Sequence, residues 1–406
     1  MKKTKILAAV AACTAAASLT VLAACGSANP HLSVDSYWYL DGFEGIQPTS
    51  IDPEENGRTA EVLLYNLTFD KESAANNYYR VNYFTDGADF ENGENAHYYK
   101  TTFYATEFDW SSDTVAEGYR MTQSDVDSLP EADKARMDGT KETVYVLETE
   151  LKISGEYVFG NGEATAENSV QFSDYINTKS YFRSARNGLE PVYSTQSVHT
   201  TTPLALRPLS ADEMCEELEY TYTVSYNFEC TQAQYTFAEE GAQAETKTAN
   251  KLQGTYSMFD NNTLYTAIRG MSLSSSFGAT VSLFVPADGG LVNVNITGGG
   301  RGELNTETQS GIIKALKDAY GEPEVPESDK EEEDTASHSY LYYNLVSVRL
   351  SDSKGAARTA MYSAVDDEDD NTYRATMLYL NQPLSYNLGR WEFTLDKVVS
   401  VLGAKA

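Results

Sequence analysis

The chain has 406 residues, and its 60 acidic against 30 basic side chains give a formal net charge of −30 at pH 7. A surface this acidic repels nucleic acid and anionic lipid headgroups, so the charge excludes a nucleic-acid-binding protein. The chain also holds 29 Tyr, a residue that favours half-exposed strands and whose ring can stack on sugars or line a groove for lipid or peptide.

The first residues have the pattern of a bacterial export signal. A start with three Lys precedes an apolar stretch over residues 6–24, which marks a signal peptide rather than an element of a domain. The residues Leu22-Ala23-Ala24-Cys25 resemble a bacterial lipobox, in which small residues precede the Cys that receives diacylglycerol. The resemblance implies a signal peptide over 1–24 and a membrane anchor of acyl chains such as palmitate on Cys25, at the extracytoplasmic face of the cell surface. The alternative is an ordinary secretory signal with an incidental Cys.

Residues 25–36 form the lipidated Cys and a short tether, and from Tyr37 onward apolar and polar residues alternate with period two. The clearest run places Tyr220, Tyr222, Val224, Tyr226 and Phe228 at every second position. Such alternation is typical of strands with one face on a core and one face in water. We predict a mainly β protein in which long, meandering antiparallel strands form a curved sheet, half-barrel or sandwich, with two or three short helices.

Signals for turns and helices separate these strands. Gly160-Asn161-Gly162 predicts a hairpin turn, and the glycine run 298–302 predicts a flexible turn. Ser128-Leu129-Pro130-Glu131 has the form of a capping box and predicts a short helix that Gly139 ends. Residues 311–320 predict a further helix.

The strands divide into two β-rich parts, a smaller one over 37–140 and a larger one over 141–402, unless all of them form one continuous curved sheet. Within the larger part, residues 322–337 are predicted to be a disordered insertion. Eight acids and two Pro lie in its first 13 residues, and such a composition cannot bury apolar surface.

Two Cys remain after the signal peptide and the lipid site, Cys215 and Cys230. Neither Gly nor Pro interrupts the alternating run between them. If this run is one strand, its length separates the two thiols by roughly 50 Å, whereas a disulfide requires Cα atoms within about 7 Å. We therefore expect two free thiols.

Two segments resemble a bacterial envelope domain family of unknown function, one over 181–193 and one over 260–273. That family is built as a long meandering sheet curled into a half-barrel, similar to carriers of lipoproteins and lipids. The resemblance implies this fold over roughly 145–300 and 340–402. The family has no assigned catalytic residues, so it implies no catalytic residue here.

Motifs for catalysis are absent from the sequence. The four His are scattered, and neither a zinc-binding HExxH, a nucleophile elbow nor a phosphate-binding loop occurs. We therefore predict no catalytic residue, no metal and no cofactor. Two acidic loops, 86–95 and 366–371, offer oxygen ligands for calcium, but solvated hairpin tips are the preferred interpretation.

These observations favour a non-catalytic binding protein for an envelope or extracellular ligand, which is a lipid, a glycan or a peptide. The alternatives are a polysaccharide hydrolase that uses a carboxylate pair and a structural or adhesive surface module. The tyrosine row 220–228 either lines a concave groove or forms the edge of a core, and its burial distinguishes the two.

Overall fold

The structure is a computed structural model that describes residues 60–70, 78–83, 97–185, 188–203, 214–239, 243–250, 258–269, 271, 278–285, 290–320, 342–350, 357–363, 376–383 and 389–400. The expected signal peptide, Cys25 and the tether lie outside these residues. The acidic segment 322–337 and the acidic loops 86–95 and 366–371 lie outside them as well.

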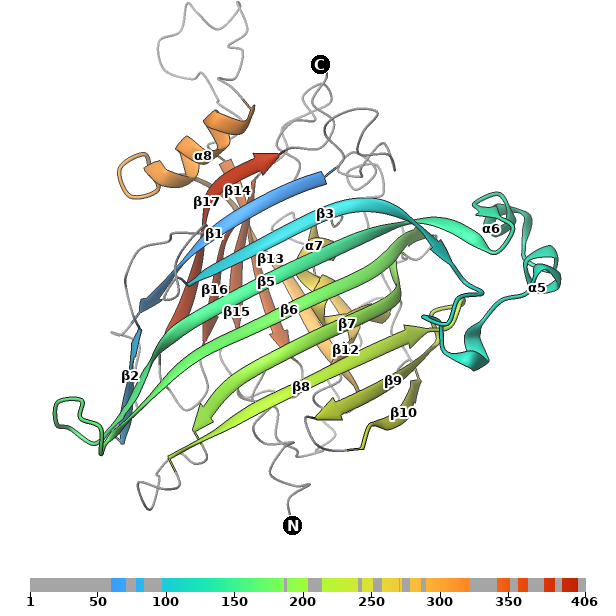
Figure 1. The fold of residues 1–406 in the computed structure, drawn as a ribbon. Coiled ribbons are helices and arrows are strands. Elements are labelled where there is room, and N and C mark those ends of the chain that lie inside the picture. Colours follow the sequence, from blue (N-terminus) through green and yellow to red (C-terminus); the bar gives the residue numbers. More distant parts are fainter. Residues whose placement is uncertain are drawn as a thin grey trace, which may run out of the picture.

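Long strands dominate the chain, which confirms the mainly β fold class (Figure 1). The strands are β1 (Ala60–Asp70), β2 (Tyr79–Tyr83), β3 (Tyr98–Asp109), β4 (Met137–Asp138), β5 (Lys141–Phe159), β6 (Ser169–Ala185), β7 (Gly188–Pro203), β8 (Cys215–Tyr226), β9 (Gln232–Glu239), β10 (Glu245–Asn250), β11 (Met258–Asp260), β12 (Gly278–Val285), β13 (Gly290–Glu303), β14 (Tyr342–Leu350), β15 (Arg358–Ser363), β16 (Met377–Pro383) and β17 (Arg390–Ser400).

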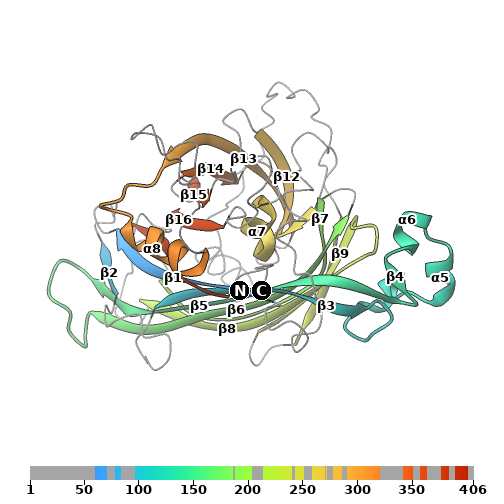
Figure 2. The same ribbon diagram turned by 90° about the horizontal axis from the view of Figure 1, so that it is seen from above.

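These strands form one large curved sheet that does not close. Antiparallel pairing runs from β10 through β9, β8, β7, β6, β5, β3, β1, β17, β16, β15, β14 and β13 to β12, and β11 joins β12 in parallel. The β3–β5 and β1–β17 pairings join residues on the two sides of position 140. Seen from above, the two halves of the sheet face each other, with the short helix α7 (Leu264–Ile268) between them (Figure 2).

The inner face of the sheet carries the main core. The rings of Phe103 and Phe182 stack there with centroids 5.8 Å apart, and Leu147 is buried with them. Two helices inside the curve, α7 (Leu264–Ile268) and α8 (Ser310–Tyr320), add buried aliphatic side chains: Leu264, Ile268, Ile312 and Leu316. The helix expected at 311–320 is thus confirmed.

The predicted capping box at Ser128 is wrong. The helix after it, α6 (Glu131–Lys134), has Pro130 as its N-cap and no side-chain cap. Ser128 instead ends the preceding helix, α5 (Gln123–Asp127), where its hydroxyl donates to the carbonyl of Ser124 at 2.8 Å. The capping box is that of α5, in which Thr122 and Asp125 satisfy each other's backbone N–H groups.

The flexible turn expected at the glycine run 298–302 is also wrong, because these residues belong to β13. A β-bulge interrupts the pairing with β14 between Gly298 and Gly300. Side chains of β14 lie across this stretch, and a Cβ on Gly299 would sit 2.9 Å from the side chain of Leu345. Close approach of a neighbouring strand, rather than flexibility, accounts for the glycines.

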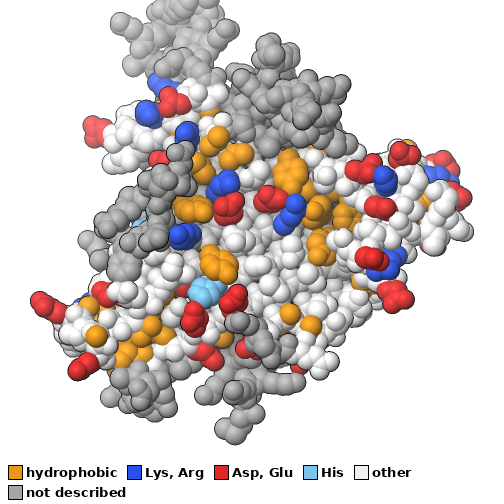
Figure 3. Space-filling model, viewed as in Figure 1, with side chains coloured by type: hydrophobic (Ala, Val, Ile, Leu, Met, Phe, Trp, Pro, Cys, Tyr) orange, Lys and Arg blue, Asp and Glu red, His pale blue; other side chains and the backbone are white. Residues whose placement is uncertain are grey.

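A segment over 110–140 folds back over one end of the outer face of the sheet. It carries η1 (Glu117–Tyr119), α5, α6 and β4, which lie to the right in Figure 1. Trp110 and Met121 from this segment are buried against Val144 of β5. The outer face beyond this segment is turned toward the viewer in Figure 3. It carries acidic, basic and hydrophobic side chains next to one another. No helix among the described residues is long and apolar enough to cross a membrane.

Candidate functional site

The tyrosine row of β8 does not line a groove. Tyr220, Tyr222, Val224, Tyr226 and Phe228 are all buried, at most 8% exposed. Side chains from the opposite wall pack on the row, as the ring of Phe284 on β12 lies 6.1 Å from that of Tyr226. Of the two alternatives for this row, the concave groove is therefore wrong, and a lipid-carrier function loses its main support.

Internal partners satisfy the hydroxyl groups of this row, which is why tyrosines are tolerated there. The Tyr226 hydroxyl donates to Asp260 at 2.6 Å, and the Asn262 amide donates to the Tyr222 hydroxyl at 3.2 Å. Both partners belong to the segment that enters α7. The sequence pattern identified the shared face of Tyr220, Tyr222, Val224 and Tyr226 correctly, but it could not show what packs against it. Its extension to Phe228 is wrong, because Phe228 follows the end of β8 and packs on Trp110 of the segment 110–140 instead.

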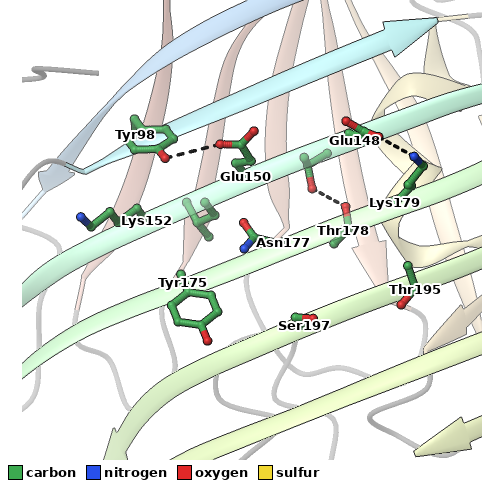
Figure 4. A pocket seen from close by; sticks show the side chains of 12 residues that line it. Tyr98, Glu148, Glu150, Lys152, Tyr175, Asn177, Thr178, Lys179, Thr195 and Ser197 are labelled. Atoms are coloured by element: carbon green, nitrogen blue, oxygen red, sulfur yellow. Dashed lines mark hydrogen bonds and ion pairs between the residues drawn. The ribbon is translucent and has the colours of Figure 1, made fainter. Parts of the chain in front are cut away.

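A shallow groove of about 480 Å³ lies elsewhere, across β3, β5, β6 and β7 (Figure 4). Its outward-facing residues are Tyr98, Glu148, Glu150, Lys152, Tyr175, Asn177, Lys179, Thr195 and Ser197. On β5 these alternate with Leu147 and Leu151, which pack into the core. The groove is thus on the outer face of the sheet, beside the segment 110–140.

The carboxylates of the groove are paired with lysines. Glu148 is 2.8 Å from the Nζ of Lys179 and accepts from the Tyr104 hydroxyl, also at 2.8 Å. Partial burial acts to raise the pKa of Glu148, but these hydrogen bonds outweigh it and the pKa is lowered. Glu150 pairs with Lys100 at 2.9 Å. The charges in the groove are thus largely balanced.

An aromatic platform stands at one end of the groove. Tyr175 on β6 lies opposite His199 on β7, and their rings stack with centroids 5.3 Å apart and planes 11° from parallel. The side chain of His199 lies 3.1 Å from Glu217 on β8, which orients the imidazole. Tyr175 is 36% exposed, high for a large hydrophobic side chain. The platform presents a flat ring to solvent next to amide, hydroxyl and carboxylate groups.

The groove holds two carboxylates, as the active site of a glycoside hydrolase does, but Glu148 lacks the raised pKa of a general acid. Glu148 and Glu150 are two positions apart on one face of a strand, so their Cα atoms are about 7 Å apart, and two carboxylates on one face are what a hydrolase requires. A hydrolase also requires a carboxyl whose raised pKa keeps it protonated, and the pKa of Glu148 is lowered. Burial raises the pKa of Asp174 to about 7 and that of Asp260 to about 6. Neither carboxyl belongs to the groove, because the alternation of β6 places Asp174 on the inner face and Asp260 is buried in the interior.

Cys215 and Cys230 are free, as predicted. The strand between them is shorter than expected, because β8 ends at Tyr226 and Cys230 lies in the following turn with φ of 52°. Burial, with Asp174 nearby, raises the pKa of the Cys215 thiol to about 12, so it is not a nucleophile near neutral pH. Among the described residues, no three His, Cys, Asp or Glu side chains converge as metal ligands would.

No family model matches the chain, and no curated protein matches it. Among solved structures, the chain is similar to a crystal structure described as a β-barrel-like protein of the domain of unknown function DUF1849 from Brucella abortus. The two are 8% identical, the match covers 85% of this chain and 99% of that one, and the TM-score is 0.38.

Proposed function

We propose that this chain is a lipid-anchored extracytoplasmic protein that binds a glycan, without transforming it, on the outer face of its sheet. The observation that carries the proposal is the exposed ring of Tyr175, stacked nearly parallel on the ring of His199 at the end of the groove. Ring faces of this kind pack against the C–H faces of sugar rings. A neighbouring row of polar side chains then hydrogen-bonds the sugar hydroxyls.

The polar groups of the groove suit an uncharged glycan. Asn177, Thr195 and Ser197 offer donors and acceptors without charge. Glu148 is neutralised by Lys179, and Glu150 by Lys100. The net charge of −30 would repel an acidic glycan.

The other two ligand classes find less support. A lipid carrier requires an apolar cavity, whereas the inner side chains of β8 are buried against Phe284. An extended peptide gains most of its affinity by adding a strand to an open sheet edge. The groove lies on a face instead, where β6 is already paired on both sides, with β5 and with β7.

The anchor rests on the resemblance of Leu22-Ala23-Ala24-Cys25 to a lipobox. Lipid on Cys25 would hold the binding face at the outside of the membrane. A glycan-binding protein placed there would capture envelope or extracellular polysaccharide.

The test is a binding measurement on the full lipoprotein in a detergent without a sugar headgroup. Neutral polysaccharides with different backbones serve as probes: β-1,4-glucan, α-1,4-glucan, mannan and xylan. We expect one of these to bind, and Tyr175→Ala to weaken its binding about 5-fold or more, since ring stacking supplies on the order of 1 kcal/mol. The control is Tyr78→Ala, which alters another exposed tyrosine, 42% exposed, outside the groove.

Three results would contradict the proposal. The first is that none of the four probes binds. The second is equal binding by the Tyr175→Ala and Tyr78→Ala variants. The third is release of reducing ends from the bound polysaccharide, which would point to the hydrolase alternative and to Glu148 and Glu150.

A further inference from the structure

The outer face carries a second aromatic pair beyond the groove. Tyr181 on β6 and Tyr193 on β7 occupy directly opposed positions, with ring centroids 5.9 Å apart. Tyr181 is six residues from Tyr175 along one strand, so both side chains are on the same face. Both rings of this second pair are half-buried at the edge of the segment 110–140.

A continuous polar floor joins the two aromatic pairs. Asn177 and Lys179 of β6 lie between Tyr175 and Tyr181, beside Thr195 of β7 and Glu148 of β5. The ammonium group of Lys179 lies 5.6 Å from the centre of the Tyr181 ring, so the floor reaches the second pair without a break.

The length of this surface defines the size of its ligand. Six residues of strand separate Tyr175 from Tyr181, about 20 Å. This distance spans about four sugar-to-sugar steps of an extended chain, so a ligand with one sugar at each end has about five units. A monosaccharide or disaccharide on one pair would not reach the other. Polar side chains alone occupy the intervening positions, as expected where the hydroxyl groups of linking sugars lie.

Resting on the glycan-binding function proposed above, we infer that the site binds an extended, uncharged oligosaccharide of about five sugar units along β6, with one sugar on the Tyr175–His199 pair and one on the Tyr181–Tyr193 pair. The pairs differ in geometry, with planes 11° apart in the first and 59° apart in the second. Only the first offers a flat, exposed stacking surface. Short ligands therefore bind there, and the second pair acts only on ligands long enough to reach it.

The experiment measures how affinity depends on ligand length. β-1,4-linked glucose and β-1,4-linked mannose oligomers of two to six units are titrated into the full lipoprotein by calorimetry. For the series that binds, we expect affinity to rise about 10-fold between two and four or five units and then to level off. Tyr181→Ala should remove this rise and leave the affinity for the dimer unchanged, whereas Tyr175→Ala should weaken every length.

The dimer also serves as the folding control, because a Tyr181→Ala protein that binds it normally has an intact first pair. Tyr193→Ala is the second variant and should reproduce the effect of Tyr181→Ala. If the affinity is the same at all lengths, or if Tyr181→Ala and Tyr193→Ala both keep the rise, the extended site is wrong while glycan binding at Tyr175 still stands. If neither series binds, the inference is wrong, because it requires an extended, uncharged oligosaccharide as the ligand.

Discussion

The hydroxyl of Tyr226 lies 2.6 Å from Oδ2 of Asp260 and donates to it in the interior of the sheet. Tyr226 is the last residue of β8, and Asp260 is the last residue of β11. The carboxylate of Asp260 also accepts from the backbone N–H of Asn262 at 2.8 Å. The amide of Asn262 in turn donates to Ser194 on β7 at 3.0 Å. A polar cluster thus joins the segment inside the curve to the wall that carries the groove.

Tyr226→Phe should destabilise the protein, because it removes one hydrogen bond from a fully buried carboxylate. We expect the free energy of unfolding to fall by about 1–3 kcal/mol, as for other buried groups left without a partner. Urea unfolding monitored by circular dichroism measures this. Tyr175→Phe removes an exposed hydroxyl and should change stability by less than about 0.5 kcal/mol; equal effects of the two variants would contradict the importance of the buried bond.

Asp260 should also make stability depend on pH. Burial raises its pKa to about 6 from the usual 3.8, so the folded state binds this proton more tightly than the unfolded state. The stabilisation that this proton gives the folded state is therefore fully present below about pH 4 and is lost as the pH rises through 6. Two pKa units correspond to a loss on the order of 3 kcal/mol.

Asp260→Asn removes this proton while keeping the shape of the side chain. The stability of the wild type relative to this variant should fall between pH 4 and pH 6, as measured by denaturant unfolding at each pH. Taking the difference cancels the other titrating carboxyls, including Asp174, whose pKa burial raises to about 7. Glu131→Gln on the exposed surface of α6 is the control and should show no such difference. If the difference in stability between the wild type and Asp260→Asn did not change with pH, this result would contradict a buried carboxyl with a raised pKa at position 260.

The sequence was sufficient for the strands but not for the site. Period-two alternation identified the row from Tyr220 to Tyr226 as one face, because side-chain direction alternates along any strand, but it wrongly extended this row to Phe228, which lies beyond the end of β8. It could not show that Phe284 and Asp260 cover that face, since they come from much later in the chain.

The groove could not be predicted for a related reason. The Glu148–Lys179 ion pair and the Tyr175–His199 stack each depend on the register between two strands. Register is fixed by pairing over the whole sheet and not by the local pattern. In the sequence, Glu148 and Glu150 alternate with Leu147 and Leu151, and this alternation, which is typical of a strand with one wet face, was the available signal for this surface.

Anchoring should depend on the thiol of Cys25. We expect Cys25→Ser to give either a soluble protein or the unprocessed precursor, because a serine hydroxyl cannot form the thioether that holds the diacylglycerol. Metabolic labelling with a palmitate analogue, followed by membrane fractionation, measures this. Cys215→Ser is the matched control and should keep its label, because Cys215 is far from the lipobox in the sequence. Label that persists on the Cys25→Ser protein would contradict the anchor.

Arg183 should be the most sensitive position under the segment 110–140. Its side chain is 5% exposed and is paired with Glu190 at 2.9 Å and Glu142 at 3.3 Å. The guanidinium also lies 4.0 Å from the centre of the Phe228 ring. Arg183→Met keeps much of the volume but removes the cation that two buried carboxylates share and leaves Glu142 with the more distant Arg136 at 3.6 Å, so we expect a loss of about 3 kcal/mol.

The same reasoning predicts that stability returns when the carboxylates are neutralised as well. The triple variant with Arg183→Met, Glu142→Gln and Glu190→Gln has no unpaired buried charge, and the Trp110 indole, which donates to Glu142 at 3.1 Å, keeps an oxygen acceptor there. We expect it to recover at least half of the loss in urea unfolding, since replacing a whole buried ion cluster is often neutral. A triple variant no more stable than Arg183→Met would show instead that Arg183 acts through its packing against Phe228, where its stem and planar head cover the ring.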